Sequence, residues 1–447
     1  MAKELYIVHC VDTEGPLNET LYDTFKRVKD IFGFDIEPTI DNLKKLQNKE
    51  INLSGKEDAV YQLVAPQRLN MNRTWYDIDQ MLDRITAKQF RNKLLDSDGN
   101  GWFFNWYCMD HVGFNDVNPR HRDAGYHNVF DKYSMLRKIQ KTDSIYFHFH
   151  PVAICGDYNI AGTSYLYNSP LYDILVHKVI DRSFFPASYR PGFHCERPDS
   201  NWFLEQWIPF DYANQACDSV DDQPDLSFGR WGNWHMATRE WKSYHPSIKN
   251  YQVEGDCKRS IARCLNMEAR LREITLIEVD KAFARANEGK TTILSFCNHD
   301  FRDMEPEINK IRNMIETISK KYPDVRFYFS DAVKAFRKEL GINKSSPNLS
   351  ASLIKKTANE TVLEITCDNC FGPQPFLAIK DLGRNYFYDN LDFIVEGKKW
   401  AYTFDLNTIN IEYVDEIGIA CNSDSGVTEI VNINVKNNTQ KKTIINN

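Results

Sequence analysis

The sequence lacks a block of basic residues and any long apolar run. Lys and Arg total 55 against 62 Asp and Glu, which gives a net charge of -7. Because nucleic-acid phosphates need clustered Lys and Arg, this composition argues against a nucleic-acid partner. No apolar stretch approaches the length of about 20 residues that spans a bilayer, so we expect no transmembrane segment.

A compact cysteine framework is also missing. The 11 cysteines are an odd number, and no cleavable apolar segment precedes the strand-like run that starts near residue 5. We therefore expect a soluble, reduced, cytoplasmic protein. Cys367 and Cys370 are the one pair with metal-ligand spacing, but no second pair follows to complete a tetrahedral site. A turn in a β domain is the favoured interpretation of this pair.

Residues 1–341 alternate strand-like apolar runs with helical periodicity. The spacing of apolar residues predicts helices over 21–32 and 308–318, and a long helix is expected over about 265–286. Such alternation is typical of a β/α layer or barrel built around buried strands. A chain of 447 residues with 42% hydrophobic residues can bury a large core, divided into two or three domains.

The character of the sequence changes after residue 341. Residues 342–352 are linker-like, and turn residues separate the short strand-like runs 361–366, 393–395, 409–414 and 430–435. This pattern predicts a small all-β, sandwich-like accessory domain over 353–447. It contains no catalytic constellation. A role in binding glycan, in covering the barrel or in contacts between subunits of a homo-oligomer is left open.

Four of the apolar runs in the first part end in residues that a hydrolase needs. The runs 5–11, 144–147, 188–189 and 291–296 lead, in turn, to Asp12 with Glu14, His148 with His150, Arg190 and His299. In parallel α/β sheets the carboxyl ends of the strands form the active face. The sequence therefore places a candidate site at these strand ends.

Each of these residues is weighed against a structural role. Asp12 and Glu14 could point to a common centre from a continuing strand, or could cap a turn and the following helix. His148 and His150 project from the same face of an extended strand, which favours two ligands of one metal ion over two hydrogen-bonded histidines. Arg190 could orient a carboxylate through a bidentate hydrogen bond or lie on the surface.

The order and content of these segments resemble the polysaccharide deacetylase (NodB homology, carbohydrate esterase family 4) superfamily over about residues 1–340. The resemblance implies a distorted (β/α) barrel with fewer than eight regular strands. It also implies roles for six residues: Asp12 as general base, Glu14, His148 and His150 as metal ligands, Arg190 as the residue that holds the aspartate, and His299 as general acid.

Two motifs depart from the usual pattern of this superfamily. The second motif is H-x-H here instead of H-x-x-x-H, and a threonine separates the two acids of the first motif, which are adjacent aspartates in most relatives. The roles of the acids therefore stay open, since Asp12 could bind the metal while Glu14 acts as the base.

The resemblance implies a metal-dependent hydrolase of carbon–nitrogen (amide) bonds, with Zn as the expected ion. It would remove an N-acetyl group from a sugar, and cytoplasmic placement favours an activated or lipid-linked precursor of a surface polysaccharide. The candidate substrate contacts are Asp110, His111, Arg120, Arg122, Trp231 and Trp234. The arginines suit a phosphate or acidic sugar, and the aromatic rings could stack on a sugar or pack their segment onto the barrel.

Two other functions compete with this prediction. The first is cleavage of a non-carbohydrate amide or imide, as in some relatives of this superfamily. The second is non-catalytic glycan binding by a barrel that has lost its metal, which predicts binding that is insensitive to chelator.

Overall fold

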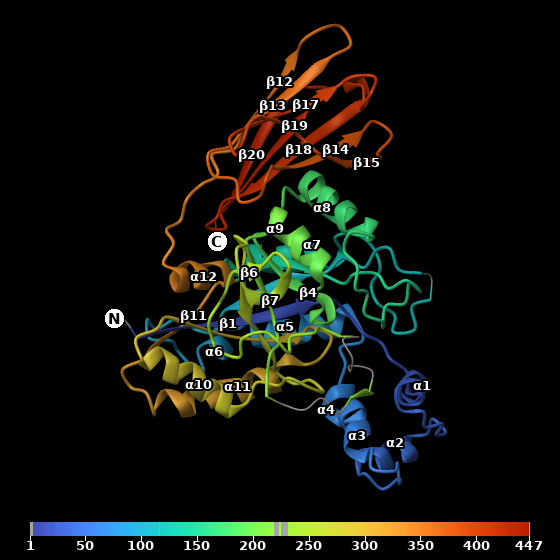
Figure 1. Cartoon of the computed structure of the whole chain (residues 1–447). Helices are drawn as coiled ribbons and strands as arrows, with labels where there is room; N and C mark the ends of the chain where they lie inside the picture. The colour runs from blue at the N-terminus through green and yellow to red at the C-terminus, as the bar shows by residue number, and fades with distance from the viewer. Residues whose placement is uncertain (1–2, 116, 219–222, 225–230, 447) are drawn as a thin grey trace.

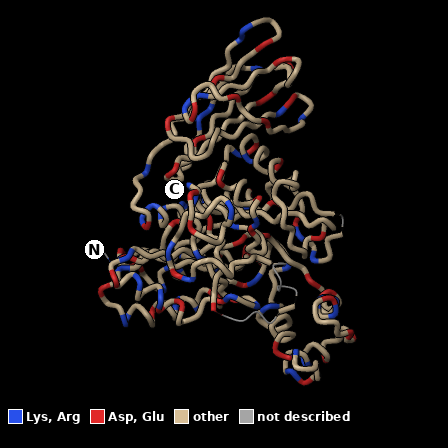
Figure 2. Tube along the Cα trace, in the orientation of Figure 1, with Lys and Arg blue, Asp and Glu red and all other residues tan. Residues whose placement is uncertain are grey.

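The computed structural model describes residues 3–115, 117–218, 223–224 and 231–446, and it divides into a barrel and a sandwich (Figure 1). A parallel sheet with surrounding helices comes first along the chain, and antiparallel sheets follow it. This confirms the expected α/β barrel with an all-β part behind it. Among the described residues no helix has the length and apolar character to cross a membrane. Basic and acidic residues are interspersed along the chain (Figure 2).

The barrel is a nine-stranded parallel sheet in which β8 and β9 belong to one extended segment. Because β8 pairs with β5 and β9 pairs with β10, this segment joins the two edges and nearly closes the barrel. Strand β11 pairs with the beginning of β1. The strands are β1 (Glu4–Thr13), β2 (Phe104–Cys108), β3 (Ser144–Phe149), β4 (Ser188–Pro191), β5 (Phe210–Asn214), β8 (Ser260–Arg263), β9 (Leu265–Asn266), β10 (Thr292–His299) and β11 (Arg326–Phe329).

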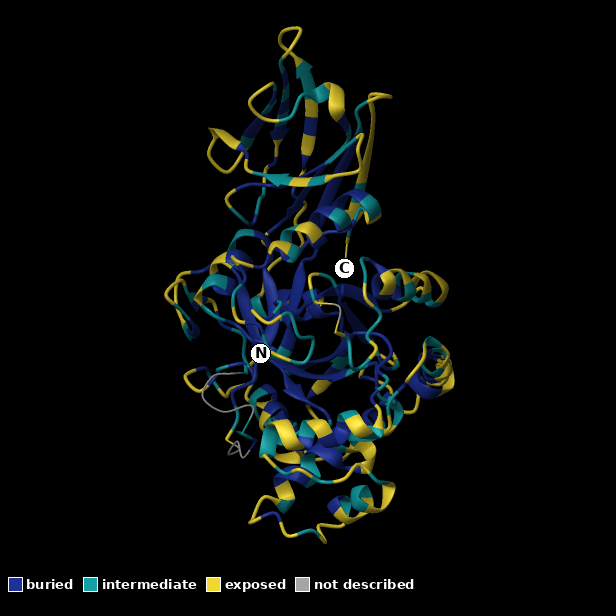
Figure 3. Cartoon of the chain, turned by 90° about the vertical axis from the view of Figure 1, so that its right-hand side faces the viewer, coloured by how far each residue is buried: buried dark blue, intermediate teal, exposed yellow. Residues whose placement is uncertain are grey.

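Tyrosines fill part of the interior of the barrel. The hydroxyl groups of Tyr107 and Ser188 share a hydrogen bond of 2.8 Å, and the Tyr212 hydroxyl donates to the carbonyl of Ala332 at 2.7 Å. Figure 3 shows buried residues running through these strands. Since side chains alternate along a strand, Asp12 faces the same interior as the buried Cys10, but nearer the carboxyl end. Cys10 and the residues of β1 before it pack into the core of the barrel, so a site can form only toward the carboxyl ends of the strands.

The helices confirm two of the three sequence predictions. The helices are α1 (Leu21–Phe32), α2 (Ile40–Gln47), α3 (Glu57–Val64), α4 (Pro66–Leu69), α5 (Trp75–Ile85), α6 (Lys88–Arg91), α7 (Asn128–Gln140), α8 (Ser169–Arg182), α9 (Pro198–Trp207), α10 (Leu276–Asn287), α11 (Met304–Ser319) and α12 (Ala332–Leu340). Helices over 21–32 and 308–318 are present as α1 and within α11. The helix expected over 265–286 is wrong in its first half. Residues 265–266 pair with β10, and α10 begins after the Thr275 cap, whose side chain accepts from the Glu278 N–H.

The sandwich has two antiparallel sheets, ordered β12-β13-β17-β16 and β15-β14-β18-β19-β20. Its strands are β12 (Ser350–Lys355), β13 (Thr361–Thr366), β14 (Phe376–Asp381), β15 (Tyr386–Asp389), β16 (Asp392–Val395), β17 (Lys399–Phe404), β18 (Val414–Asn422), β19 (Thr428–Asn434) and β20 (Thr439–Ile445). The predicted linker is too long, because residues 350–352 already pair with β13. The predicted strand 409–414 is also wrong. Residues 411–413 form a short 3-10 helix capped by Asn410, and β18 starts at residue 414.

The sandwich packs directly on α8 of the barrel part. Phe376 and Ala420 of the sandwich share one hydrophobic cluster with Val179 and Ile180 of α8. A Cβ at Gly418 would lie 2.5 Å from Cγ1 of Val179, so only glycine allows this approach. The two parts therefore share a core.

The buried His9 of β1 gives stability a pH dependence. Trp102 Nε1 donates to His9 Nδ1 at 2.9 Å, so the other ring nitrogen donates to the Asn298 side-chain oxygen at 2.9 Å. Burial lowers the pKa of His9 to about 4, whereas the unfolded chain binds this proton near pH 6.5. We expect a loss of about 3 kcal/mol in the free energy of unfolding as the pH falls from 6.5 to 4.

Denaturant unfolding at several pH values tests this expectation. His9→Gln should flatten the pH dependence, and the exposed His235→Gln should leave it unchanged. Equal slopes in the native chain and in His9→Gln would contradict the assignment.

Candidate active site

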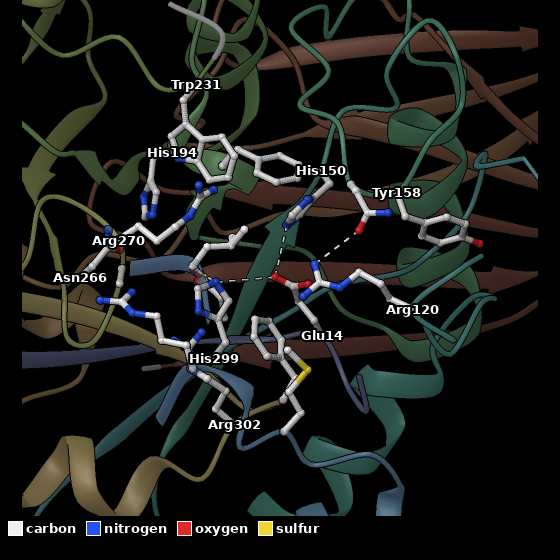
Figure 4. Close-up of a pocket in the computed structure, with 18 of the residues that line it drawn as sticks. Glu14, Arg120, His150, Tyr158, His194, Trp231, Asn266, Arg270, His299 and Arg302 are labelled. Carbon is white, nitrogen blue, oxygen red and sulfur yellow. Dashed lines mark hydrogen bonds and ion pairs between the residues drawn. The ribbon is translucent and has the colours of Figure 1, made fainter. Parts of the chain in front are cut away.

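Strand register brings the predicted residues together at the carboxyl end of the barrel. Asp12 of β1 is aligned with His299 of β10, and His148 of β3 is aligned with Arg190 of β4. Asp12, His148 and His299 line one cavity together with Glu14 and His150, whereas the fully buried Arg190 contacts this group through Asp12. Figure 4 shows Glu14 between His150 and His299. Residues that are far apart in the sequence thus form one site.

Glu14, His148 and His150 converge and could hold a metal ion. Glu14 Oε1 lies 3.8 Å from Nε2 of His148 and 3.5 Å from Nε2 of His150, and these two nitrogens are 2.9 Å apart. Around a tetrahedral ion with Zn–N bonds of about 2.0–2.1 Å, ligand atoms are separated by about 3.4 Å. The spacing of the three side chains therefore suits a single ion.

The second ring nitrogen of His148 supports this interpretation. Nδ1 of His148 lies 3.0 Å from the carbonyl oxygen of Arg190. Because a carbonyl only accepts, Nδ1 carries the proton, and Nε2 keeps its lone pair toward Glu14 and His150. A histidine that binds a metal through one ring nitrogen is usually oriented by a hydrogen bond from its other ring N–H, often to a backbone carbonyl.

Arg190 holds Asp12 through a buried bidentate ion pair. Its Nε and Nη2 donate to the two carboxylate oxygens of Asp12 at 2.6 and 2.9 Å, and its Nη1 donates to the carbonyl of Tyr212. Burial acts to raise the pKa of Asp12, but Arg190 and then His148 lower it below its usual range. Asp12 is therefore ionised and fixed, whereas Glu14 is the acid that faces both histidines.

His299 completes the group from β10, the strand that pairs with β1. Its Nε2 lies 3.9 Å from Asp12 Oδ2 and 3.7 Å from Glu14 Oε1, and its side chain is 24% exposed. Burial lowers the pKa of His299 to about 3, although both acids act to raise it. The resting imidazole is therefore neutral and can accept a proton.

Asp300 supports the loop that carries Glu14. It accepts hydrogen bonds from the N–H groups of Glu14 and Gly15 at 2.8 and 3.0 Å, and from the Tyr133 hydroxyl at 2.8 Å. Burial raises the pKa of Asp300 to about 7, although these donors act to lower it. Gly15 has a φ of 73°, in the left-handed region that favours glycine. The chain can therefore turn immediately after Glu14.

Gly192 supports His150 by leaving space for its ring. A Cβ at position 192 would lie 2.3 Å from Cδ2 of His150. We expect Gly192→Ala to push the imidazole aside and to weaken metal binding about 10–100-fold, as loss of a supporting contact does at other metal sites. Titration of metal-free protein with Zn²⁺ measures the change. Gly397→Ala is a control outside the barrel, because a Cβ there meets nothing within 4 Å, although the φ of 68° strains an alanine. Its metal affinity should stay native, and unchanged affinity in Gly192→Ala would contradict the expectation.

Arginines surround the cavity. The guanidinium groups on its wall belong to Arg27, Arg68, Arg120, Arg122, Arg270 and Arg302, whereas Asp12 and Glu14 are its acids. Arg27 and Arg120 share one buried carboxylate, Glu19, at 2.8 and 2.9 Å. Burial, and then the charge of Arg27, lower the pKa of Arg120 to about 9. Arg68 and Arg302 also have acidic partners, Glu273 and Glu307, at 3.5 and 3.3 Å. The wall is therefore rich in arginine side chains, most of which an acid holds in place.

Three of the six predicted substrate contacts line the cavity, namely Arg120, Arg122 and Trp231. Arg122 also forms an ion pair with Glu14 at 2.6 Å, so it orients this acid. Trp234 does not line this cavity, and its role as a substrate contact stays a prediction. It is 2% exposed and donates from Nε1 to the carbonyl of His194 at 2.9 Å, which packs its segment onto the barrel.

Asp110 and His111 do not line the cavity either, and their role as substrate contacts stays a prediction. Asp110 is 2% exposed and pairs with the buried Lys178 at 2.6 Å. Nε2 of His111 donates to the carbonyl oxygen of Glu14 at 2.9 Å. The sequence predicted both residues near the site because they lie in a polar loop after a strand. In the structure, the side chains of both residues bind other groups of the protein.

Several wall residues could not be found from the sequence. Arg27 and Arg68 come from the helical segment between β1 and β2, and Arg270 comes from the loop before α10. None of them belongs to a motif. Arg302, three residues after His299, could have been proposed from proximity alone. No family model, curated protein or solved structure matches the chain, so its function is argued from this geometry.

Proposed function

We propose that this chain is a metal-dependent amide hydrolase that removes an N-acetyl group from a sugar. The observation that carries the proposal is the convergence of Glu14, His148 and His150 beside Asp12 and His299 in one cavity. A carboxylate and two imidazoles leave room for water on a bound ion, as in catalytic rather than structural zinc sites. The resemblance to polysaccharide deacetylases supports the same reaction class.

Glu14, His148 and His150 would hold the ion, with Zn²⁺ as the expected metal. When bound, such an ion polarises the amide carbonyl and lowers the pKa of a coordinated water from 15.7 toward about 7. The chain itself supplies the orientation. Arg122 fixes one oxygen of Glu14, and the carbonyl of Arg190 fixes the ring of His148.

Asp12 and His299 would move the proton. Asp12 is ionised, so it can accept a proton from the attacking water. His299 is neutral and lies 3.9 Å from Asp12, so it can take up this proton and deliver it to the departing amine nitrogen. Acetate and the free amino sugar are the products.

The arginines on the cavity wall favour a substrate that carries phosphate. Guanidinium groups bind phosphate through paired hydrogen bonds, and several of them lie within one cavity. The cavity volume of about 190 Å³ is below the 300–1,000 Å³ that drug-sized ligands occupy. It therefore suits one sugar ring with its phosphates toward the rim, as in an activated or lipid-linked precursor.

Acetate release from a panel of substrates tests the proposal. The panel contains N-acetylhexosamines linked to a nucleoside diphosphate or to a polyprenyl phosphate, the free sugars, an N-acetylated polymer and small cyclic amides and imides. We expect release from the phosphate-linked sugars with Zn²⁺-loaded protein and none after chelation. Turnover of the cyclic compounds alone would show that the substrate is a non-carbohydrate amide or imide and not an N-acetylated sugar. No turnover of any compound by metal-loaded protein would refute hydrolysis.

A further inference from the structure

Three cysteine side chains meet inside the sandwich, far from any motif of the barrel. Cys367 and Cys370 follow β13, and Cys421 lies in β18 of the opposite sheet. Their sulfur atoms all lie within 4.8 Å of one another, and Sγ of Cys367 is 3.6 Å from Sγ of Cys421. Cys367 and Cys421 are buried, whereas Cys370 is half-buried.

The position of Cys421 supplies the third ligand that the sequence near Cys367 and Cys370 lacks. The Cys367–Cys370 pair has ligand spacing but no second pair beside it in the sequence, and β18 supplies the third sulfur from 51 positions further on. Around a tetrahedral ion with Zn–S bonds of about 2.3 Å, sulfur atoms are separated by about 3.8 Å. The observed separation of 3.6 Å is close to this value, whereas a disulfide needs about 2.05 Å.

We propose that Cys367, Cys370 and Cys421 bind a thiophilic metal ion, with Zn²⁺ as the expected ion. Three thiolates select such an ion over hard cations such as Mg²⁺ or Ca²⁺. The half-buried Cys370 leaves a side of the cluster open, where water can take the fourth position. Among the described residues, no carboxylate or imidazole joins the three sulfur atoms, so no general acid or base lies beside the ion. We therefore assign the ion a structural role, although its open fourth position differs from the four protein ligands that structural zinc sites usually have.

The ion would join the two sheets and fix the contact of the sandwich with the barrel. The loop after Cys370 pairs with β18, since Phe371 N–H donates to the carbonyl of Asn422 at 2.8 Å. The side chain of Asn422 donates to the carbonyls of Pro186 and Trp207 in the barrel part at 2.7 and 2.8 Å. A Cβ at Gly372 would lie 1.7 Å from the carbonyl oxygen of Gln206, so backbone meets backbone there.

Another group of potential ligands does not carry the same inference. His127, His177 and Asp181 also lie close together, but Asp181 already accepts from both histidines and from the Tyr386 hydroxyl. The ring of His177 stacks on Tyr386 at 3.7 Å. These contacts explain that group as part of the interface between α8 and the sandwich.

Titration of reduced, metal-free full-length protein with Co²⁺ tests the cysteine site. Thiolate ligation produces an intense near-ultraviolet charge-transfer band, which the oxygen and nitrogen ligands of the barrel site cannot produce. We expect the band to reach the same final intensity in the native chain and in the His148→Ala plus His150→Ala variant, and to saturate at one equivalent in this variant, where the barrel site does not compete for Co²⁺. The readout is thus independent of hydrolysis and of the barrel site.

Cys370→Ser is the decisive variant, because this half-buried position tolerates the change better than the buried ones. We expect it to weaken Co²⁺ binding at least tenfold, and Zn²⁺ to displace Co²⁺ from the native site. Cys155→Ser, at an exposed cysteine, is the matched control and should keep the native band. Absence of the band from the folded, fully reduced native protein, or an unchanged band in Cys370→Ser, would overturn the proposal.

Discussion

Replacing both His148 and His150 by alanine is expected to abolish metal binding in the barrel and to reduce amide hydrolysis at least about 10³-fold. Polarisation of the carbonyl and activation of water are worth several kcal/mol to a hydrolase, and each 1.36 kcal/mol corresponds to a factor of ten in rate. Removing the two imidazoles leaves only Glu14 of the converging group, and one carboxylate does not retain Zn²⁺ against a chelator. Elemental analysis of protein purified without a metal-affinity tag measures the loss.

The matched control replaces two exposed histidines, His235 and His245, by alanine. This variant has the same number of imidazoles removed, but both lie outside the cavity wall, so metal content and turnover should stay native. The proposed cysteine site also binds Zn²⁺. The double variant should therefore lose the equivalent of Zn²⁺ bound in the barrel and retain the equivalent bound by the cysteines. Full retention of both metal and turnover after removal of His148 and His150 would exclude the barrel site.

The strand ends were predictable from the sequence because the signal is local. Asp12, His148, Arg190 and His299 each follow an apolar run, and parallel strands bring their carboxyl ends to one edge. The spacing of His148 and His150 indicated a common target for the same reason, since side chains two apart share a strand face. Helices α1 and α11 were likewise predictable from periodicity within one segment.

Closure of the barrel was not predictable, because it depends on pairing between distant segments. Residues 265–266 have a helical pattern of apolar residues, yet they pair with β10. The arginines of the cavity wall and the three cysteines also come from distant segments, so their grouping could not be predicted from the sequence. Nothing near Cys367 in the sequence indicates that Cys421 lies 3.6 Å away. Asp110 shows the limit of a local signal. Its position in a polar loop after a strand predicted a substrate contact, whereas in the structure its side chain forms a buried ion pair with Lys178.

Replacing Arg190 by methionine is expected to affect both stability and the pH dependence of catalysis. Arg190 is fully buried, and its loss leaves the Asp12 carboxylate buried without its partner. Breaking one side of a buried pair costs about 3–5 kcal/mol. We therefore expect a loss of this size in the free energy of unfolding, measured in denaturant at neutral pH.

The same change should move the acid limb of the activity profile toward higher pH. Arg190 lowers the pKa of Asp12, and without it burial dominates and raises that pKa. Asp12 accepts a proton only when ionised, so the variant should work only at a pH above the new value. At neutral pH we expect turnover to fall about 10²–10⁴-fold, the usual contribution of a positioned base. Arg190→Lys should restore the charge without the paired hydrogen bonds, and should therefore return the acid limb partly toward the native position.

Arg259→Met separates the catalytic effect from the structural one. Arg259 is as buried as Arg190 and pairs with Glu196 and Asp211, but neither of these acids lines the cavity, whereas Asp12 does. Its loss should destabilise the fold by a similar amount while leaving the acid limb of the activity profile unchanged. If Arg190→Met lowers stability and keeps the native pH profile, as Arg259→Met should, then Asp12 is not the base. The carboxylate that takes the proton would then have to be Glu14, because it is the other acid on the cavity wall.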